Sequence, residues 1–209
     1  MTIRVEKVVT SGIFSLDGED FDVENNIWLI GDDSEVLVVD AAHDAAPIVE
    51  AVAGRTLVGI VCTHGHNDHI NAVGDLSDAV KAPIYLHPGD RMLWDVVYPE
   101  VGPDRELADG DTLTVAGTRL EVLNTPGHSP GCCCLYAPDL GVLFSGDTLF
   151  NGGPGATGRS YSDYATIVES IADRLLSLPE DTVVHTGHGD DTTIGAEAPS
   201  LAEWRSRAT

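Results

Sequence analysis

The sequence predicts an α/β sandwich in which two mixed β-sheets pack face to face and helices cover both outer faces. Three observations support this fold class. Short apolar runs bounded by Gly, Pro, Asn and Asp recur along the chain, as expected of strands and turns. Stretches with helical periodicity lie between and after these runs. Each half of the chain has a group of strands followed by helices, which is typical of layered sheets with helices outside.

The first half predicts a strand meander that leads into alternating strands and helices. Alternating side chains and a Gly-Asp-Asp-Ser turn indicate the meander. Asp44 is suited to cap a helix, because its side chain can accept a hydrogen bond from the first turn. The elements expected here are strands Ile3–Thr10, Val23–Gly31, Glu35–Asp40, Leu57–Cys62 and Pro83–Leu86, and helices Ala45–Ala53, Ile70–Val80 and Gly89–Val97.

The second half predicts short strands joined by Gly or Pro turns, then a longer helix and a last strand. Ile167, Ile171 and Leu175 recur on one face of that helix, as expected of an amphipathic helix that packs on a sheet. The elements expected here are strands Asp111–Val115, Arg119–Asn124, Cys132–Ala137, Val142–Ser145 and Thr182–His185, and helices from about Ser162 to Ser177 and Ala196 to Trp204.

Length and composition fit a single domain over residues 1–209 with a sizeable core. No apolar run approaches the roughly 18 residues that cross a bilayer, and the first seven residues lack the apolar segment of a signal peptide. We therefore expect a soluble, cytoplasmic protein. The four cysteines, of which three are consecutive at 132–134, are expected to be small core residues, since neighbouring strand residues face opposite ways.

A cluster of ligand-type side chains follows the predicted buried strand Leu57–Cys62. From position 63 the sequence is Thr-His-Gly-His-Asn-Asp-His-Ile, which places three imidazoles and a carboxylate within six residues. In an extended His-x-His, the rings of His64 and His66 point the same way and can bind one cation. Asp68 and His69 come at the turn into a helix, so they can serve a second cation about 3.5 to 4 Å away.

Further ligand-type residues lie in Gly- or Pro-rich loops after predicted strands. His128, Asp147 and His188 each follow a β run. The backbone angles open to glycine let such loops turn sharply and let a metal approach the backbone. Together with the first cluster they indicate a metal site. The candidate ligands are His64, His66, Asp68, His69, His128, Asp147 and His188.

In this order, the candidate ligands resemble those of the metallo-β-lactamase superfamily, and within it the branch similar to glyoxalase II (hydroxyacylglutathione hydrolase). The similarity extends from Asp40 to the loop around His188 and the Thr192-Thr193-Ile194-Gly195 segment that follows. The resemblance implies the αββα metallo-β-lactamase fold, with the site in a cleft at one edge of the sandwich.

The resemblance also implies two divalent metal ions. The implied ligands are, for the first ion, His64, His66 and His128, for the second, Asp68, His69 and His188, and as a bridge Asp147. Imidazoles and carboxylates suit Zn²⁺ or Fe; we expect Zn²⁺, with Fe or a mixed Zn/Fe pair as alternatives. Coordination lowers the pKa of water to about 7, so metal-bound hydroxide is the implied nucleophile. Asp68 is assigned as a catalytic residue as well as a ligand.

The implied activity is hydrolysis of S-acyl derivatives of a low-molecular-weight thiol such as glutathione, mycothiol or bacillithiol. The alternatives are a mononuclear Fe persulfide dioxygenase, a lactonase or another hydrolase of the same fold. Antibiotic hydrolysis is not expected, because β-lactamases of this fold have Cys or Ser where Asp147 stands. Full-length glyoxalase II adds a helical domain that binds glutathione, whereas only about twenty residues follow His188, so glutathione itself is not implied.

Substrate contacts are expected from a Gly-rich segment, residues 152–158, and the residues after it. We expect this loop to pass over the metals, with Arg159 and Tyr161 contacting a small thioester substrate.

The chain has 34 acidic and 11 basic residues, a net charge of -23, so nucleic acid or an anionic membrane is not an expected partner. The oligomeric state is left open. Structural roles are expected for His43, His87 and His185, with a place in the cleft as the alternative for His43.

Overall fold

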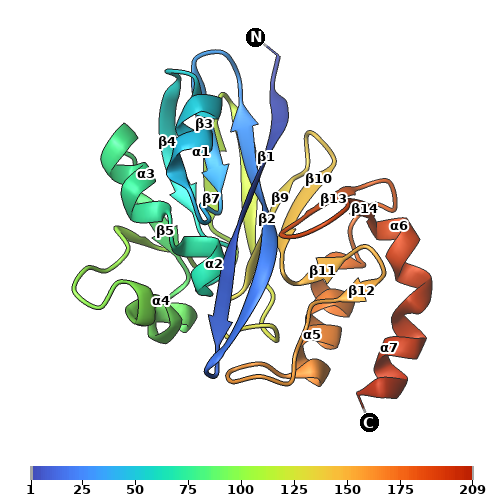
Figure 1. Cartoon of the computed structure of the whole chain (residues 1–209). Coiled ribbons are helices and arrows are strands. Elements are labelled where there is room, and N and C mark those ends of the chain that lie inside the picture. The colour runs from blue at the N-terminus through green and yellow to red at the C-terminus, as the bar shows by residue number, and fades with distance from the viewer. Residues whose placement is uncertain (1, 209) are drawn as a thin grey trace.

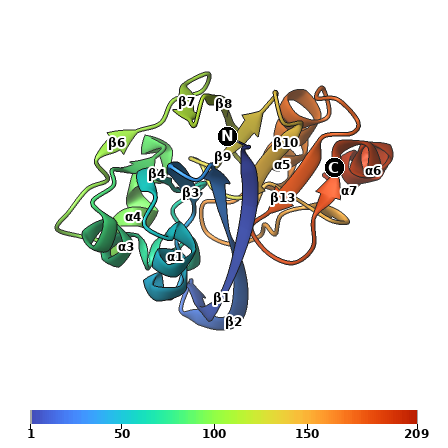
Figure 2. The ribbon, with the colours of Figure 1, turned by 90° about the horizontal axis from the view of Figure 1, so that it is seen from above.

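The computed structural model describes residues 2–208 and has the predicted fold class, two packed sheets with helices on both outer sides (Figure 1). Viewed from above, the helices of the first half and those of the second half lie on opposite sides of the sheets (Figure 2). Among the described residues, no helix is long and apolar enough to cross a membrane.

The first sheet has six strands that follow one another in chain order, β1 to β6. The first three are antiparallel and the later neighbours are parallel. Their bounds are β1 Arg4–Leu16, β2 Glu19–Gly31, β3 Glu35–Val39, β4 Thr56–Val61, β5 Ile84–Leu86 and β6 Arg105–Glu106.

The second sheet has the strand order β14-β13-β10-β9-β8-β7, in which β10 and β13 are parallel and the other pairs antiparallel. A two-stranded ribbon, β11-β12, follows β10. The bounds are β7 Thr112–Val115, β8 Thr118–Asn124, β9 Cys133–Ala137, β10 Val142–Gly146, β11 Leu149–Phe150, β12 Gly153–Pro154, β13 Val183–Thr186 and β14 Thr192–Thr193. The two-residue strands β6, β11, β12 and β14 were not predicted.

The helices divide between the two outer faces, and 3₁₀ turns precede two of them. Those of the first half are α1 Ala45–Val52, α2 Asn67–Ile70, α3 Val73–Val80 and α4 Arg91–Val97, with a 3₁₀ turn at Pro88–Asp90. Those of the second half are α5 Tyr164–Ser170, α6 Ile194–Glu197 and α7 Leu201–Arg207, with a 3₁₀ turn at Ala198–Ser200.

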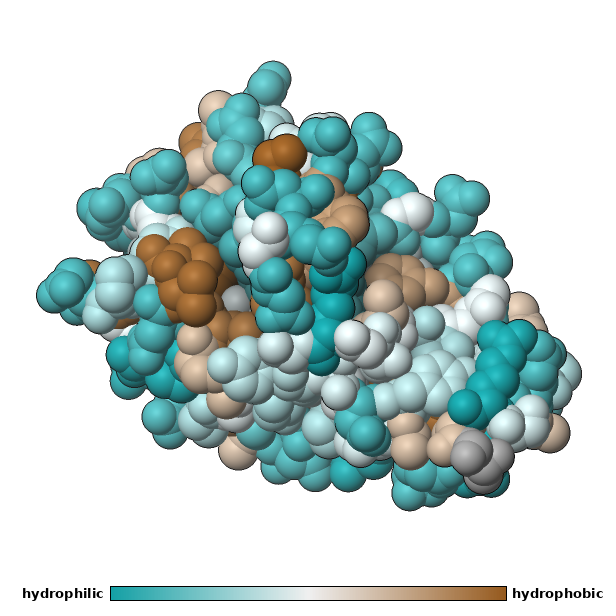
Figure 3. Space-filling view, turned by 60° about the horizontal axis from the view of Figure 1, so that its bottom comes forward, coloured by the Kyte–Doolittle hydropathy of each residue, from teal (hydrophilic) through white to brown (hydrophobic). Residues whose placement is uncertain are grey.

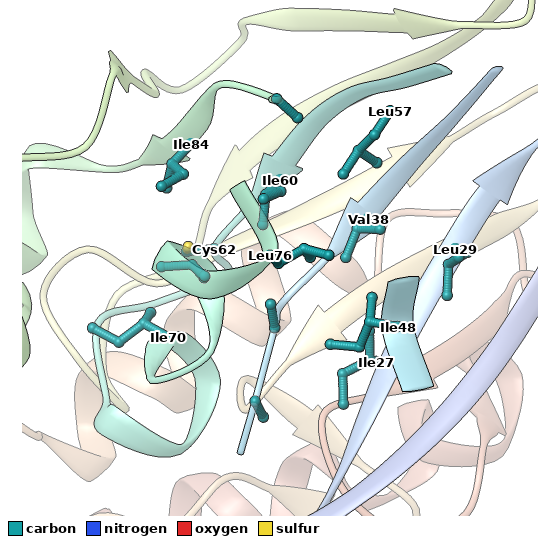
Figure 4. Packing of buried hydrophobic residues seen from close by; sticks show 14 of the residues in the cluster. Ile27, Leu29, Val38, Ile48, Leu57, Ile60, Cys62, Ile70, Leu76 and Ile84 are labelled. Atoms are coloured by element: carbon teal, nitrogen blue, oxygen red, sulfur yellow. The ribbon is translucent and has the colours of Figure 1, made fainter. Parts of the chain in front are cut away.

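Three hydrophobic clusters hold the layers together, one between the sheets and one under each helical layer. Neighbouring strand residues face opposite sides of a sheet. Ile27 and Leu29 of β2 therefore belong to the cluster under the helices of the first half, whereas Trp28 and Ile30 belong to the cluster between the sheets. Figure 4 shows Ile27 beside Ile48 of α1. The predicted core role of the cysteines is confirmed, since all are free and buried.

The β1-β2 hairpin is longer than the predicted strands Ile3–Thr10 and Val23–Gly31. Each strand has 13 residues, and the turn between them is Asp17-Gly18. Both turn residues have positive φ, 56° and 79°, as a two-residue hairpin turn of the Asp-Gly type requires. The hairpin therefore projects beyond the sheet and ends over the loop that follows β12, with Ser160 N–H bonded to Asp17.

The predicted helix Ile70–Val80 is confirmed over Val73–Val80, as α3, but its start is wrong, because the chain breaks at residues 71–72 between α2 and α3. Ala41, just after β3, donates its N–H to His69 C=O and accepts from Ala72 N–H. These bonds use backbone groups that a continuous helix would pair internally. The helix predicted to reach Ser177 also changes, since α5 ends at Ser170 and a π-helical turn continues to Leu175.

Gly127, in the loop after β8, packs directly against the start of α5. Substituting it should therefore destabilise the fold. Its φ is 137°, and a Cβ atom there would collide with the backbone of Ile167. We expect Gly127→Ala to cost about 1–2 kcal/mol for the backbone and about 1–3 kcal/mol more for overpacking, measured by denaturant unfolding. Gly141→Ala is the control, since Gly141 has φ 62° and open space. Equal losses in the two variants would refute this account.

Candidate metal centre

The candidate ligands converge because they follow strand ends at one edge of the two sheets. His64, His66, Asp68 and His69 come after β4 and at the start of α2. The other three come from the second sheet, after β8, β10 and β13. Since β10 and β13 run parallel, their carboxyl ends lie at the same edge. The structure thus brings together all seven residues that the sequence singled out.

The first cluster consists of His64, His66 and His128. The Nδ1 atom of His66 lies 3.0 Å from His64 Nε2 and 3.0 Å from His128 Nε2. Burial lowers the pKa of His64 well below its usual value and that of His66 to about 3. Neutral rings at these positions turn nitrogen atoms toward one point, which suits a cation with imidazole ligands.

The second cluster consists of Asp68, His69 and His188. The Nε2 atoms of the two histidines are 3.2 Å apart, and Asp68 Oδ2 is 3.6 Å from His69 Nε2 and 3.4 Å from His188 Nε2. Burial lowers the pKa of His188, but Asp147 and Asp68 outweigh it and raise the pKa to about 10. In the absence of a cation this cluster therefore retains protons, which a cation must replace.

Asp147 lies between the clusters. Its Oδ2 atom is 3.5 Å from His128 Nε2 of the first cluster and 3.4 Å from His188 Nε2 of the second. Its Oδ1 atom is buried and makes no hydrogen bond, although it is 3.3 Å from His69 Nε2. A Cβ on residue 187 would collide with Asp147 Oδ1, so glycine is required there for the loops to approach.

These donor sets fit divalent cations. A buried carboxylate oxygen without a hydrogen bond is costly unless a ligand satisfies it, and Asp147 Oδ1 is such an atom. The Nδ1 atom of His66 is shared by both contacts of the first cluster, and it carries either one proton or one lone pair, so it can form a hydrogen bond with only one of the other two nitrogens. The histidine and aspartate clusters therefore suit divalent metal binding.

Groups behind the clusters fix the imidazole orientations. The Nδ1 atom of His69 is 2.8 Å from Asp40 Oδ2, and Asp40 also accepts from Thr63 N and Thr63 Oγ1. The Nδ1–H groups of His128 and His188 donate to the backbone carbonyls of Ala156 and Glu24. Such partners hold a ring so that its remaining nitrogen points at the metal.

Asp90 joins the two loops that carry the first cluster, although no sequence pattern indicates this role. It has no exposed surface. Its Oδ2 accepts hydrogen bonds from Gly65 N and Ser129 Oγ, and its Oδ1 from Gly131 N. Gly65 separates the two histidines after β4, and Ser129 follows His128. Asp90 therefore ties the loop of His64 and His66 to the loop of His128.

A cavity adjoins the first cluster on the side of the β1-β2 hairpin. Its lining includes Phe14, His66, His128 and Arg159, which places Arg159 beside the cluster, as predicted for a substrate contact. Its guanidinium pairs with Glu19 at 2.7 Å and lies over the Phe21 ring at 4.5 Å.

The predicted contact Tyr161 is more than half exposed and is not among the residues that line this cavity.

Figure 3 shows a largely hydrophilic surface on the side that carries the hairpin tip, with a hydrophobic patch toward its left. Helix α4, which carries the exposed hydrophobic residues Met92 and Val96, lies on that side of the molecule (Figure 1).

The remaining histidines differ in their surroundings. His87 accepts from Gly89 N–H at the 3₁₀ turn, and His185 pairs with Asp191. His43 instead contacts Asn25, a buried residue that lies against the second cluster. Asn25 follows an acidic and polar stretch of β2 and gave no sequence signal, because its proximity to the cluster arises only from the fold.

Comparison with protein families matches residues 21–188 to the family described as Metallo-beta-lactamase superfamily. The chain is 39% identical over 174 residues to an uncharacterized protein of Aquifex aeolicus (strain VF5), covering 78% of this chain and 82% of that protein. It is 32% identical over 193 residues to the hydroxyacylglutathione hydrolase GloC of Haemophilus influenzae, covering 85% of this chain and 91% of that protein.

Solved structures with the same fold include the BLEG-1 B3 metallo-beta-lactamase, with a TM-score of 0.78 and 30% identity over 91% of this chain and 97% of that one. They also include TTHA1623 in a di-iron-bound form, with a TM-score of 0.74 and 34% identity over 84% of this chain and 93% of that one.

Replacing Asp90 should loosen the first cluster and lower stability. Asp90→Ala leaves three buried donors without an acceptor, each at a cost of about 1–3 kcal/mol, whereas Asp90→Asn keeps one carbonyl acceptor and should lose less. We expect reduced thermal stability and weaker cation binding, measured by calorimetry. Asp95→Asn, an exposed residue of α4 paired with Arg91, is the control. Our account fails if Asp90→Ala behaves like this control.

Proposed function

The chain belongs to the metallo-beta-lactamase superfamily of metal-dependent hydrolases, and from this premise we propose that it hydrolyses thioesters of a low-molecular-weight thiol with two divalent cations. The position of Asp147 between the two clusters carries the proposal of two cations. The similarity to the hydroxyacylglutathione hydrolase GloC supports the thioester substrate. Zn²⁺ is our proposed metal, and the di-iron form of TTHA1623 supports Fe as the alternative.

In this proposal the first cluster would hold one cation, the second cluster would hold the other, and Asp147 would serve both. When bound, the cations lower the pKa of a coordinated water to about 7 and polarise the substrate carbonyl. Asp40, Asp90 and the backbone carbonyls behind the rings hold the ligands in place. Asp68, assigned as catalytic from the sequence, here acts as a ligand of the second cluster.

Arg159 and the adjoining cavity are the proposed substrate contacts. Arg159 places a positive charge next to the first cluster in a strongly acidic protein. Its present partner Glu19 is mostly exposed, so a substrate carboxylate can take its place by forming a bidentate pair. Tyr161, which is exposed and follows the loop of residues 152–158, remains a proposed substrate contact.

The net charge of -23 also bears on the substrate. An acidic exterior repels polyanions, and the repulsion weakens with salt. We therefore propose a small thioester as the substrate and neither nucleic acid nor an anionic membrane as a partner.

A thioester panel with parallel metal analysis tests the function. We expect short S-acyl esters of a small thiol to be hydrolysed faster than acyl-coenzyme A, with the gap shrinking at high salt as charge repulsion is screened. The readouts are kcat/KM at low and high ionic strength and metal content per chain. One Fe per chain with oxygen uptake on a persulfide would indicate the dioxygenase instead, and lactone cleavage without thioester cleavage would indicate a lactonase.

Asp147→Ala should abolish turnover and weaken both cations. Without its carboxylate, two neighbouring positive charges lose the group that screens their repulsion. We expect a drop of more than about 100-fold in cation affinity, larger than loss of an outer contact causes, measured by competition with a chelator. His188→Ala should weaken only the second cation, and Asp139→Ala, a replacement in the exposed turn before β10, is the control. Two cations bound normally in Asp147→Ala would overturn the bridging role.

A further inference from the structure

Asn25 faces every ligand of the second cluster. It lies in β2 and is almost fully buried. Its amide nitrogen is 3.1 Å from Asp68 Oδ2, 3.3 Å from His69 Nε2 and 3.5 Å from His188 Nε2. One neutral amide group is thus within reach of all three atoms that a second cation would bind.

Neighbouring hydrogen bonds determine which end of the amide faces the cluster. Asn71 Oδ1 accepts from the His43 backbone N–H at 2.6 Å, so Asn71 Nδ2 is the atom that lies 3.3 Å from His43 Nδ1. An NH₂ group can only donate, so His43 Nδ1 accepts and its Nε2 carries the proton. That proton is donated to Asn25 Oδ1 at 2.8 Å. The NH₂ group of Asn25 is therefore left to face Asp68.

The fold holds this chain of residues tightly. His43 has a φ of 62°, a left-handed conformation that few residues adopt without a reason. A Cβ on residue 12 would collide with the His43 ring, so β1 passes directly over it. The hydroxyl of Thr10 donates to Ala42 C=O beside it. His43 is thus confined between β1 and Asn25 and cannot easily turn away.

We propose that Asn25, oriented by His43, is a positioning residue for the second cation, an inference that rests on the dinuclear site of the proposed function. In the cation-free protein one of its N–H groups donates to Asp68 Oδ2 and so holds this carboxylate beside the Nε2 atoms of His69 and His188. A carboxylate oxygen has two lone pairs, so Asp68 Oδ2 can accept from Asn25 and still bind a cation. Asn25 has no corresponding contact with the first cluster, so its effect falls on the second cation.

Three substitutions test the role. Asn25→Leu has a similar shape but no donor, and should weaken the second cation by about 10–100-fold, as loss of an outer-shell partner does, while the first stays bound. Asn25→Asp also lacks the donor but adds a carboxylate, and should bind the second cation at least as tightly as the native chain. His43→Asn suits the left-handed backbone but is too short to orient the amide, and should give a smaller loss.

The measurement is Zn²⁺ content per chain after equilibration with chelators of graded strength, together with thermal unfolding of the metal-free proteins to check folding. Asn151→Leu and Asn151→Asp are matched controls, because Asn151 is exposed and its amide donates to the Asp191 carbonyl, away from both clusters. If Asn25→Leu releases the second cation with the native chain, or releases the first cation as readily as the second, the inference is wrong. A native chain that holds only one cation would overturn the dinuclear site as well.

Discussion

The carboxylate of Asp147 is the group on which the rest of the site depends. It comes from the end of β10, and one of its oxygens faces a histidine of each cluster. Two glycines permit this: side chains at Gly155 or Gly187 would collide with the Asp147 backbone or carboxylate. The parallel pairing of β10 with β13 brings the Gly187 loop alongside. The sheet register, the glycines and the ligand geometry are therefore parts of one arrangement.

Different residues outside the ligand set hold the first and the second cluster in place. Asp90 ties the loops of the first cluster together, whereas Asp40 and Asn25 stand behind the second. These residues come from separate parts of the first half of the chain: Asn25 from β2, Asp40 from the position just after β3, and Asp90 from the 3₁₀ turn before α4. Buried polar groups that are fully paired define a single arrangement, and unpaired ones are costly. The ligands are thus positioned before any cation arrives, which lowers the cost of binding it.

The ligands could be predicted from the sequence because their signal is local. A buried strand followed by closely spaced histidines, and single ligands after later strands, need no knowledge of tertiary contacts. Asn25 and Asp90 carry no such signal, because only the packing of β2 on α2, and of the 3₁₀ turn on the His128 loop, gives them their partners. Arg159 lines the cavity beside the first cluster, and its pairing with Glu19 depends on the hairpin, whose position only the fold determines.

The break in the predicted helix over residues 70–80 also depends on tertiary contacts. Residues 70–80 have helical character throughout, and the break arises from backbone bonds to Ala41, far away in sequence. The hairpin is a different case, since Asp17-Gly18 is a strong turn signal that would have given the correct strand lengths. The two-residue strands form because neighbouring chains pass close, and no sequence pattern that short predicts a strand.

Anomalous diffraction from crystals of the zinc-loaded protein tests the central claim most directly. Our account predicts two peaks about 3.5–4 Å apart, the first next to His64, His66 and His128 and the second next to Asp68, His69 and His188, with Asp147 in contact with both. A single peak, or two peaks of which only one contacts Asp147, would contradict it.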